Sequence, residues 1–178
     1  AQPDGAVLVR WAQGLLRVRL VADARGRAAP RGETRLRGPE TVSLLQRWRG
    51  APGEAASCVC SCADGWAWLA RRADGAHYTQ LTLATATPGL PKREGLQAWL
   101  RARLEELPPA RAWIAGCEPA GAPLARSSTA VLRSPLWERG VLRVGDAAMA
   151  VDPLSGNGIF QALSSASVAP AVINTLLR

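Results

Sequence analysis

The chain is poor in several residue types that carry chemistry in proteins. Its 178 residues include one histidine, His77, and single tyrosine, phenylalanine and methionine residues. Histidine is the usual general base and the commonest metal ligand. One histidine gives no histidine metal cluster, and no Ser-His-Asp arrangement is recognisable, which removes most hydrolases. We interpret His77 as a surface or hydrogen-bonded residue, expect no metal ion, leave the catalytic residues unknown, and expect a bound cofactor to carry any chemistry.

Cysteine is also scarce, and its spacing argues against a disulfide framework. Cys58, Cys60 and Cys62 alternate along the chain, and Cys117 stands alone. Alternate residues of a strand share one face, where neighbours two apart rarely reach disulfide geometry. The spacing also differs from the C-x-x-C of zinc sites. We expect buried, reduced thiols and a cytoplasmic location; a redox or metal role is the alternative.

Long apolar runs, nucleic-acid motifs and lysine are also missing. No stretch of eighteen apolar residues occurs, so we expect no membrane span. The formal charge is +8, from 22 Lys and Arg against 14 Asp and Glu, and Lys92 is the only lysine. The arginines are dispersed along the chain, which indicates that most lie on a solvated surface. Some of them are expected to contact an anionic cofactor or further polypeptide. Nucleic-acid binding is a third-ranked alternative.

Strand and turn signals fill the first half of the chain. Asp64-Gly65 and Asp74-Gly75 are typical hairpin turns. They predict an antiparallel sheet with one apolar face. Residues 24–40 are rich in Arg, Gly and Pro and are interpreted as a crossing segment. The predicted strands are 6–12, 14–23, 41–49, 57–63, 66–72 and 77–85.

The second half mixes helices and strands. Leucines at helical spacing predict a helix over 92–107, starting after Pro91 and ended by Pro108-Pro109. One or two strands are expected within 111–133, and a buried strand over 141–144. A closing helix is expected over 158–177, with a kink at Pro170.

The most specific motif lies between that buried strand and the closing helix. The strand ends in Gly145-Asp146, and Asp152-Pro153-Leu154-Ser155-Gly156-Asn157-Gly158 then opens directly into the helix. A helix N-terminus has unpaired N–H groups and a positive dipole end, which suit an anionic or electron-rich ligand. Glycines on both sides of Asn157 allow close approach of the backbone. An ordinary strand–turn–helix is the alternative.

This run resembles the second FAD-contacting segment of flavoprotein monooxygenases of the p-hydroxybenzoate hydroxylase type, a group that includes flavin-dependent halogenases and geranylgeranyl reductases. The resemblance implies that Asp146 hydrogen-bonds the ribityl chain of FAD. It also implies that the loop lies against the isoalloxazine ring. The loop residues are Pro153, Leu154, Ser155, Gly156, Asn157 and Gly158.

Two weaker matches accompany this motif. Asp23, with Ala24-Arg25-Gly26 after it, resembles an Asp-x-x-Gly segment near the cofactor, and we assign Asp23 equally to structure or to FAD contact. Trp66-Ala67-Trp68 resembles the Trp-x-Trp of halogenases, but Leu69-Ala70 replaces the usual Ile-Pro, which weakens a halogenase assignment. We favour core packing over substrate stacking for Trp66 and Trp68.

The group's opening G-x-G-x-x-G, which holds the FAD pyrophosphate, does not occur in this sequence. We therefore expect the C-terminal half of a longer flavoprotein that binds FAD poorly without its N-terminal half. The expected fold is mixed α/β, with part of a Rossmann-like FAD-binding domain and an antiparallel substrate domain. The expected divisions are 1–30 (FAD-binding segment), 31–115 (substrate sheet with helix) and 116–178 (C-terminal FAD-binding segment).

The resemblance is strongest to a subgroup near the halogenases whose members include monooxygenases that modify tryptophan for quinone cofactors. It implies hydroxylation of an aromatic small molecule, or of a tryptophan in a peptide or protein, through a flavin C4a-hydroperoxide. Electrons would come from a flavin reductase or NAD(P)H. The alternatives are a halogenase, a geranylgeranyl-reductase-like enzyme, and a non-catalytic binding module on the same fold.

Overall fold

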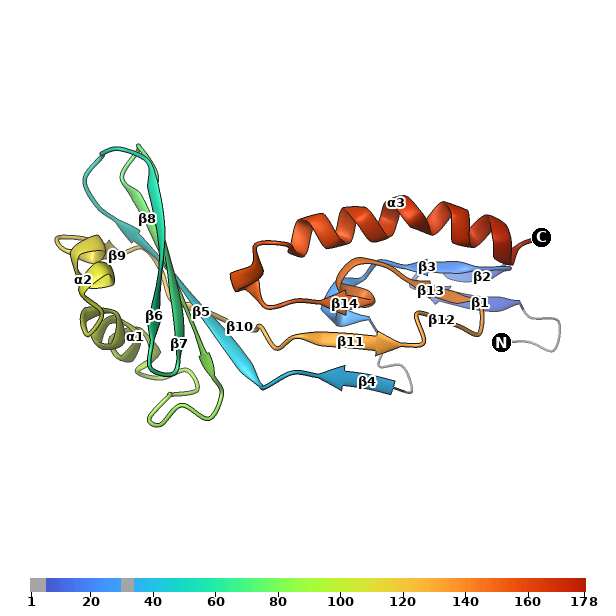
Figure 1. Cartoon of the computed structure of the whole chain (residues 1–178), viewed down its shortest axis with the longest axis horizontal. Coiled ribbons are helices and arrows are strands. Elements are labelled where there is room, and N and C mark those ends of the chain that lie inside the picture. The colour runs from blue at the N-terminus through green and yellow to red at the C-terminus, as the bar shows by residue number, and fades with distance from the viewer. Residues whose placement is uncertain (1–5, 30–33) are drawn as a thin grey trace. The chain divides into compact units, whose positions relative to one another are not determined.

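A computed structural model describes residues 6–29 and 34–178, which divide into two compact units (Figure 1). Unit 1 is formed by Ala1–Gly38 together with Thr129–Arg178. Unit 2 is the continuous stretch Pro39–Ser128. The chain therefore leaves unit 1 once, completes unit 2, and returns.

Unit 2 is built on an antiparallel sheet with the strand order β10-β5-β8-β7-β6, in which β9 also pairs with β5. The four long strands predicted from the sequence are all present. Gly65 is needed at the β6–β7 turn, because a Cβ there would collide with the carbonyl of Thr82. The strands are β5 (Thr41–Arg49), β6 (Ala56–Cys62), β7 (Gly65–Arg71), β8 (Ala76–Ala84), β9 (Glu118–Pro119) and β10 (Leu124–Ser127).

Two helices, α1 (Leu96–Glu105) and α2 (Pro108–Ile114), cover one face of this sheet (Figure 1). The buried leucines of α1 repeat every four residues and, with Ala110 and Ile114 of α2, pack on alternate residues of the strands, which closes a core. Full burial of each such side chain is worth about 1.5–3 kcal/mol. The buried core residues are Leu44, Trp48, Ala67, Leu69, Leu81, Leu83, Leu96, Leu100, Leu104, Ala110, Ile114 and Cys117.

The helices differ from the sequence expectation at both ends of the predicted segment. The helix expected from residue 92 begins at Leu96, because Gly95 precedes it with a φ of +74° that no helical residue adopts. Pro108-Pro109, expected only to end α1, also begins α2. Proline suits the first turn of a helix, where its missing N–H needs no partner.

The opposite face of the sheet carries Trp66 and Trp68, which are half-buried and lie outside the core cluster. The expectation that both pack in the core is therefore wrong. Their neighbour Ala67 occupies the core face, because side chains alternate along a strand. Trp48 is 1% exposed on the core face, and its indole N–H donates to the Thr79 hydroxyl at 2.9 Å.

The cysteines of β6 follow the prediction. Cys58, Cys60 and Cys62 are free, half-buried and packed against the core from one face of the strand. Burial raises the pKa of the Cys60, Cys62 and Cys117 thiols, which keeps them protonated and unreactive at neutral pH.

Unit 1 contains three small sheets with the orders β1-β2, β14-β11-β4 and β12-β13-β3. All pairings are antiparallel except that of β13 with β3, which is parallel. The strands are β1 (Val7–Trp11), β2 (Gly14–Val18), β3 (Val21–Asp23), β4 (Thr34–Arg37), β11 (Val131–Ser134), β12 (Trp137–Glu138), β13 (Val141–Arg143) and β14 (Met149–Ala150).

One expectation for unit 1 is wrong, and a second is correct in place but incomplete, since the chain does pass to unit 2 between Gly38 and Pro39. The strand predicted over 14–23 is two strands in different sheets, since β2 pairs with β1 and β3 pairs with β13. The crossing segment predicted over 24–40 contains a short 3-10 helix, η1 (Gly26–Ala28), and strand β4. Part of that segment, residues 30–33, lies outside the described residues.

Helix α3 (Gly158–Leu176) lies along the strands of unit 1 (Figure 1). Ala169 and Ile173 pack on Leu142 and Val144 of the strand region, and Pro170 lies within the helix. By length and composition α3 could cross a bilayer, since its apolar window has a mean hydropathy of 1.3 and is only 6% buried. Serines, Gln161 and Asn174 interrupt its apolar residues, so the sequence expectation of no membrane span, which rested on unbroken apolar runs, did not include this helix.

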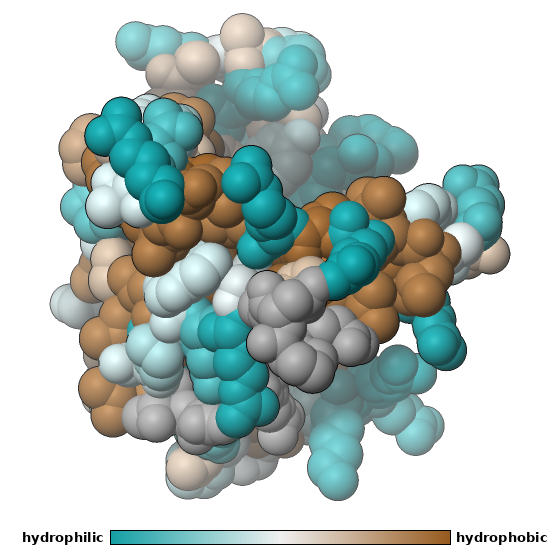
Figure 2. Space-filling model, turned by 90° about the vertical axis from the view of Figure 1, so that its right-hand side faces the viewer, coloured by the Kyte–Doolittle hydropathy of each residue, from teal (hydrophilic) through white to brown (hydrophobic). Residues whose placement is uncertain are grey.

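The outward side of α3 is strongly apolar. Ile159 is 79% exposed and Phe160 is 67% exposed. Apolar side chains also reach the surface, between hydrophilic ones, on the side drawn in Figure 2. The exposed large apolar residues of α3 are Ile159, Phe160, Leu163, Val168, Val172 and Leu176.

Candidate functional site

The candidate site begins where two parallel strands of unit 1 end side by side. β13 pairs with β3 in the register Leu142↔Ala22 and Arg143↔Asp23. The amide of Val144 continues the ladder by donating to the carbonyl of Asp23 at 3.1 Å. The segments after both strands therefore meet at one sheet edge, which is where ligands bind in α/β folds.

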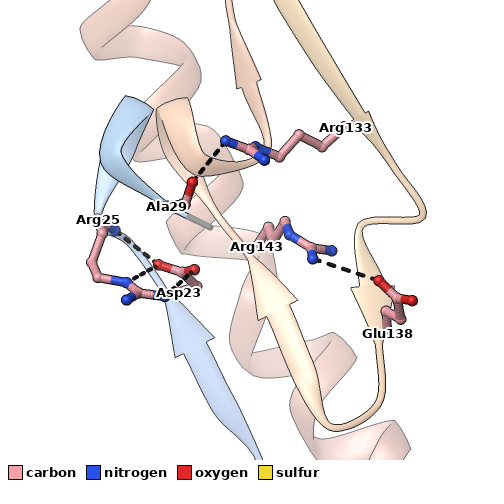
Figure 3. Close-up of polar contacts among 6 residues, drawn as sticks. All are labelled: Asp23, Arg25, Ala29, Arg133, Glu138 and Arg143. Carbon is pink, nitrogen blue, oxygen red and sulfur yellow. Dashed lines mark hydrogen bonds and ion pairs between the residues drawn. The ribbon is translucent and has the colours of Figure 1, made fainter. Parts of the chain in front are cut away.

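Asp23 holds one of these segments in shape. Its carboxylate accepts two bonds from the Arg25 guanidinium, both 2.9 Å, and one from the Arg25 amide (Figure 3). These bonds hold the pKa of the buried Asp23 carboxyl below its usual range. Of the two roles expected for Asp23, the structure supports the structural one, since its carboxylate is already engaged.

Two further arginines form hydrogen bonds or ion pairs with neighbouring segments of unit 1 (Figure 3). Buried Arg133 donates to the carbonyl of Ala29 at 3.0 Å. Arg143 lies 3.6 Å from the Glu138 carboxylate and donates to the carbonyl of Pro135. Arginine suits these positions because its planar fork can satisfy several acceptors at once. Part of the chain's positive charge is therefore structural.

The second segment is the Gly-Asp corner, which forms the 3-10 helix η2 (Gly145–Ala147). Gly145 has a φ of +58°, and a Cβ on it would lie 3.4 Å from the Cβ of Ala162. Its amide donates to the Ser165 hydroxyl at 2.8 Å. The corner is thus fixed directly on α3, and a side chain at Gly145 would be strained by the positive φ.

Asp146 lies at the open side of this corner. Its side chain is 43% exposed, and its nearest charged neighbour is the Arg27 Nε at 3.8 Å. Arg27 also donates to the carbonyl of Thr129 at 2.7 Å, so the guanidinium is held in place. The distance to Arg27 is too long for a strong hydrogen bond, and the carboxylate can accept bonds from a ligand.

The loop before α3 is organised by its own polar groups. Asp152 accepts from the Leu154 amide at 2.8 Å within η3 (Pro153–Ser155). The Ser155 hydroxyl donates to the Asp152 carbonyl and accepts from the Asn157 amide. Asn157 occupies the N-cap of α3 without a side-chain cap bond. The first N–H groups of α3 therefore lack a side-chain partner and remain available.

Asp146 and Gly158 share a hollow of about 550 Å³ in unit 1. The hollow is lined mostly by small residues, which let a ligand approach the backbone. Of the sequence-predicted residues, Pro153, Leu154, Ser155, Gly156 and Asn157 lie outside this lining and are exposed beside it. The lining residues are Ala24, Gly26, Val144, Gly145, Asp146, Gly158, Ile159, Ala162 and Ala166.

Sequence reasoning missed several contributors to this site. Ala24 and Gly26 line the hollow, whereas the sequence pattern pointed to Asp23, and Arg27 is the cation beside Asp146. Gly26 could have been identified from the sequence, because it is the glycine of the Asp-x-x-Gly segment. Ala162 could not be identified, because only the packing of α3 on Gly145 brings it there.

His77 has no role in this site. It lies on β8 in unit 2, is 6% exposed, and its Nδ1 is 3.0 Å from the carbonyl of Trp113. Cys117 lies 3.6 Å from the same nitrogen. Among residues 6–29 and 34–178, no group of three His, Cys, Asp or Glu side chains is arranged to hold a metal ion.

Comparison with known proteins gives a consistent result. No protein-family model and no curated protein matches the chain. Among solved structures, the peptidyl tryptophan dihydroxylase QhpG, essential for tryptophylquinone cofactor biogenesis, is 49% identical with a TM-score of 0.80. The match covers 97% of this chain and 42% of QhpG, so the chain spans less than half of that relative.

Two halogenases share the fold at lower identity. The myxobacterial chondrochloren halogenase CndH, a variant of the FAD-dependent halogenases, is 24% identical with a TM-score of 0.79, covering 97% of this chain and 43% of its own. The flavin-dependent halogenase CmlS is 20% identical with a TM-score of 0.79, covering 96% and 33%. The sequence resemblance is confirmed: over nearly its whole length, the chain is similar to part of the tryptophan dihydroxylase and has the fold of the flavin-dependent halogenases.

Proposed function

We propose that this chain is part of an FAD-dependent monooxygenase that hydroxylates an aromatic substrate, specifically a tryptophan carried by a peptide or protein. The observation that carries the proposal is the 49% identity to a peptidyl tryptophan dihydroxylase over 97% of the chain. The hollow at Asp146 supports it, since it joins an available carboxylate, a helix N-terminus and small lining residues.

Unit 1 is proposed to supply one side of the FAD site. The Asp146 carboxylate would accept hydrogen bonds from the ribityl hydroxyls, with the positive charge of Arg27 3.8 Å away. The amides that begin α3 would face the electron-rich edge of the ring system, where a positive helix end stabilises negative charge. When bound and reduced, FAD would supply the oxygen-activating chemistry.

The exposed loop from Pro153 to Gly158 is proposed to lie against the ring. Its side chains are exposed, and the Ser155 hydroxyl is held within the loop by the Asp152 carbonyl and the Asn157 amide. Since Gly156 and Gly158 have no side chain, the loop offers backbone to a ligand at these positions. Its contribution would be to position the ring and exclude water from one side.

The rest of the site is proposed to come from further polypeptide. The chain spans 42% of QhpG, and no G-x-G-x-x-G occurs in this sequence to hold a pyrophosphate. The outward apolar face of α3 supports this proposal, because an apolar face of that size is normally covered. We propose that the N-terminal part of a longer chain covers it.

Unit 2 is proposed to form the substrate side. The face of its sheet that lacks α1 and α2 carries Trp66, Trp68 and Tyr78, which can stack on an aromatic substrate. A flavin reductase or NAD(P)H would supply electrons. A cytoplasmic location is proposed from the free cysteines.

The test uses the complete polypeptide that contains this chain, with FAD, a flavin reductase, NADH and a tryptophan-bearing peptide under oxygen-18 gas. We expect the peptide to gain one or two labelled oxygen atoms on tryptophan, measured by mass spectrometry. Incorporation of chloride or bromide from the buffer instead would identify a halogenase. A protein that never retains flavin would support a non-catalytic binding module.

A further inference from the structure

A second hollow lies in unit 2, at the end of the sheet where β5 finishes and β8 begins. Its volume is about 390 Å³. Arg47, Arg49, Arg72 and Tyr78 are among its lining residues. The chain enters and leaves unit 2 at the opposite end of β5, because Thr41 begins that strand and Ser127 pairs with Val42.

The hollow carries uncompensated positive charge. Arg47 and Arg49 are exposed and lie two residues apart on β5, so their side chains leave the same face of the sheet. In the part of the chain that the structure describes, neither guanidinium has a hydrogen bond or ion pair. Arg72 pairs with Asp74 at 2.9 Å, so the four charges leave a surplus of two positive charges.

The arginines also stand at the end of the aromatic face of the sheet. Arg47 pairs with Tyr78 across the β5–β8 ladder, and Ala70 of β7 pairs with the other side of Tyr78. Further along the same face, Trp68 and Trp66 pair with Gln80 and Thr82. One continuous face therefore changes from indole rings to guanidinium groups.

We propose that this face binds an acidic polypeptide segment, with carboxylates on Arg47 and Arg49 and an aromatic residue over Trp66 and Trp68. The proposal rests on the proposed function and adds the chemistry of the substrate's flanking residues. A guanidinium group can bind a carboxylate through two parallel, charge-assisted hydrogen bonds. Indole rings offer a flat apolar surface to another aromatic ring.

The length of the face requires a polypeptide. Trp66 pairs with Thr82, and Thr82 pairs with Ser43 of β5, so these three residues lie in one row across the sheet. Arg49 lies six residues after Ser43 on β5, which is about 20 Å along the strand. No single amino acid spans that distance, whereas an extended peptide of six or seven residues does.

Charge favours an acidic peptide over a nucleic acid. Unit 2 contains ten Lys and Arg residues and eight Asp and Glu residues, so it is nearly neutral outside this hollow. A nucleic-acid site needs cations that follow several phosphates.

The test measures binding of a defined peptide to the complete polypeptide. The probe has one tryptophan and, four and six residues away, two glutamates, which matches the spacing from Ser43 in the Trp66 row to Arg47 and Arg49. A matched probe has glutamines instead. The test variant is R47E/R49E. The control variant, K92E/R93E, makes the same change of charge at two exposed residues before α1.

We expect R47E/R49E to weaken binding of the glutamate probe about tenfold or more, the loss of roughly one to two charge-assisted bonds. K92E/R93E should change it less than twofold, within the effect of surface charge. The milder R47Q/R49Q variant should weaken binding in the same direction but less than R47E/R49E, because it removes the attraction without adding repulsion. The glutamine probe should bind wild type about as weakly as the glutamate probe binds R47Q/R49Q.

Equal binding by both double variants, or of both probes, would overturn the proposal. So would a single-stranded DNA oligonucleotide that binds at Arg47 and Arg49 more tightly than the glutamate probe. Flavin content and oxidation of reduced flavin are measured on the same samples. Both should stay at wild-type level, so loss of the peptide site is distinguishable from failure of the monooxygenase assignment.

Discussion

The two units bury their apolar residues to very different extents. Unit 2 closes a core of twelve buried residues between its sheet and two helices. The buried cluster beneath α3 in unit 1 consists of Leu142, Val144 and Ala169, while the opposite side of the helix is exposed. An exposed apolar surface of this kind marks an interaction site. We therefore expect unit 2 to fold by itself and propose that unit 1 forms one side of a larger structure.

Charge divides in the same way. Unit 1 carries twelve Arg against six Asp and Glu, whereas unit 2 has ten cations against eight anions. Most of the net charge of +8 therefore belongs to the unit that is proposed to hold an anionic cofactor. Favourable long-range attraction to such a ligand follows from this distribution.

The largest expected effect tests whether unit 2 is self-sufficient. Residues 39–128 expressed alone should unfold cooperatively in urea. Leu69→Ala should destabilise this segment by about 2–5 kcal/mol, because Leu69 is fully buried. Val59→Ala, at a site 54% exposed on the same sheet, is the control and should cost less than about 1 kcal/mol. If residues 39–128 alone show no cooperative unfolding transition, unit 2 does not fold by itself and the proposed difference between the two units is wrong.

The next effect tests whether further polypeptide covers α3. Phe160→Ala should destabilise the complete polypeptide by about 3 kcal/mol, the cost of a buried aromatic. In the 178-residue chain the same change should cost about 0.5 kcal/mol or less, because Phe160 is 67% exposed there. Both values come from denaturant unfolding. Equal small values in the two proteins would show that this side of the helix stays open.

A smaller effect concerns the cofactor side of unit 1. Asp146→Ala in the complete polypeptide should weaken FAD retention about tenfold to hundredfold, since hydrogen bonds to a charged acceptor contribute about 1.5–3 kcal/mol. FAD is measured after denaturation and by titration of the apoprotein. Glu94→Ala, at an exposed residue of unit 2, is the control. Unchanged flavin content in Asp146→Ala would remove Asp146 from the site.

The smallest effect is the pH dependence of the Asp23–Arg25 pair. Because Arg25 lowers the pKa of Asp23 in the folded state, the pair's stability is present above the ordinary value of 3.8 and is lost as pH falls through the lower folded pKa. Asp23→Asn should cost about 1 kcal/mol at pH 6, allowing for the exposure of Arg25. Urea unfolding across the acid range should show that cost shrinking toward zero. A pH-independent difference would exclude the pair as its cause.

The sheet of unit 2 could be predicted from the sequence because its signals are local. Asp64-Gly65 and Asp74-Gly75 determine the turns, and alternation determines the strands between them. The division of β2 from β3 was missed, since a strand's pairing partner is not encoded in its own residues. Helix α2 was missed because Pro108-Pro109 ends one helix and starts another.

The candidate site was predictable only in part for the same reason. Asp146 and Gly158 belong to one continuous motif, and both line the hollow. Arg27 lies far from them in sequence and comes close only because β3 and β13 run parallel. Trp66 and Trp68 share a face, as expected, but the sequence could not show that α1 and α2 cover the other one.

The visible absorption spectrum of the purified complete polypeptide tests the central claim most directly. The account predicts a flavin band with one FAD released per chain on denaturation, and much weaker binding of added FAD by the 178-residue chain alone. A complete polypeptide that is colourless and stays so after FAD is added would contradict the claim that this chain forms one side of a flavin site.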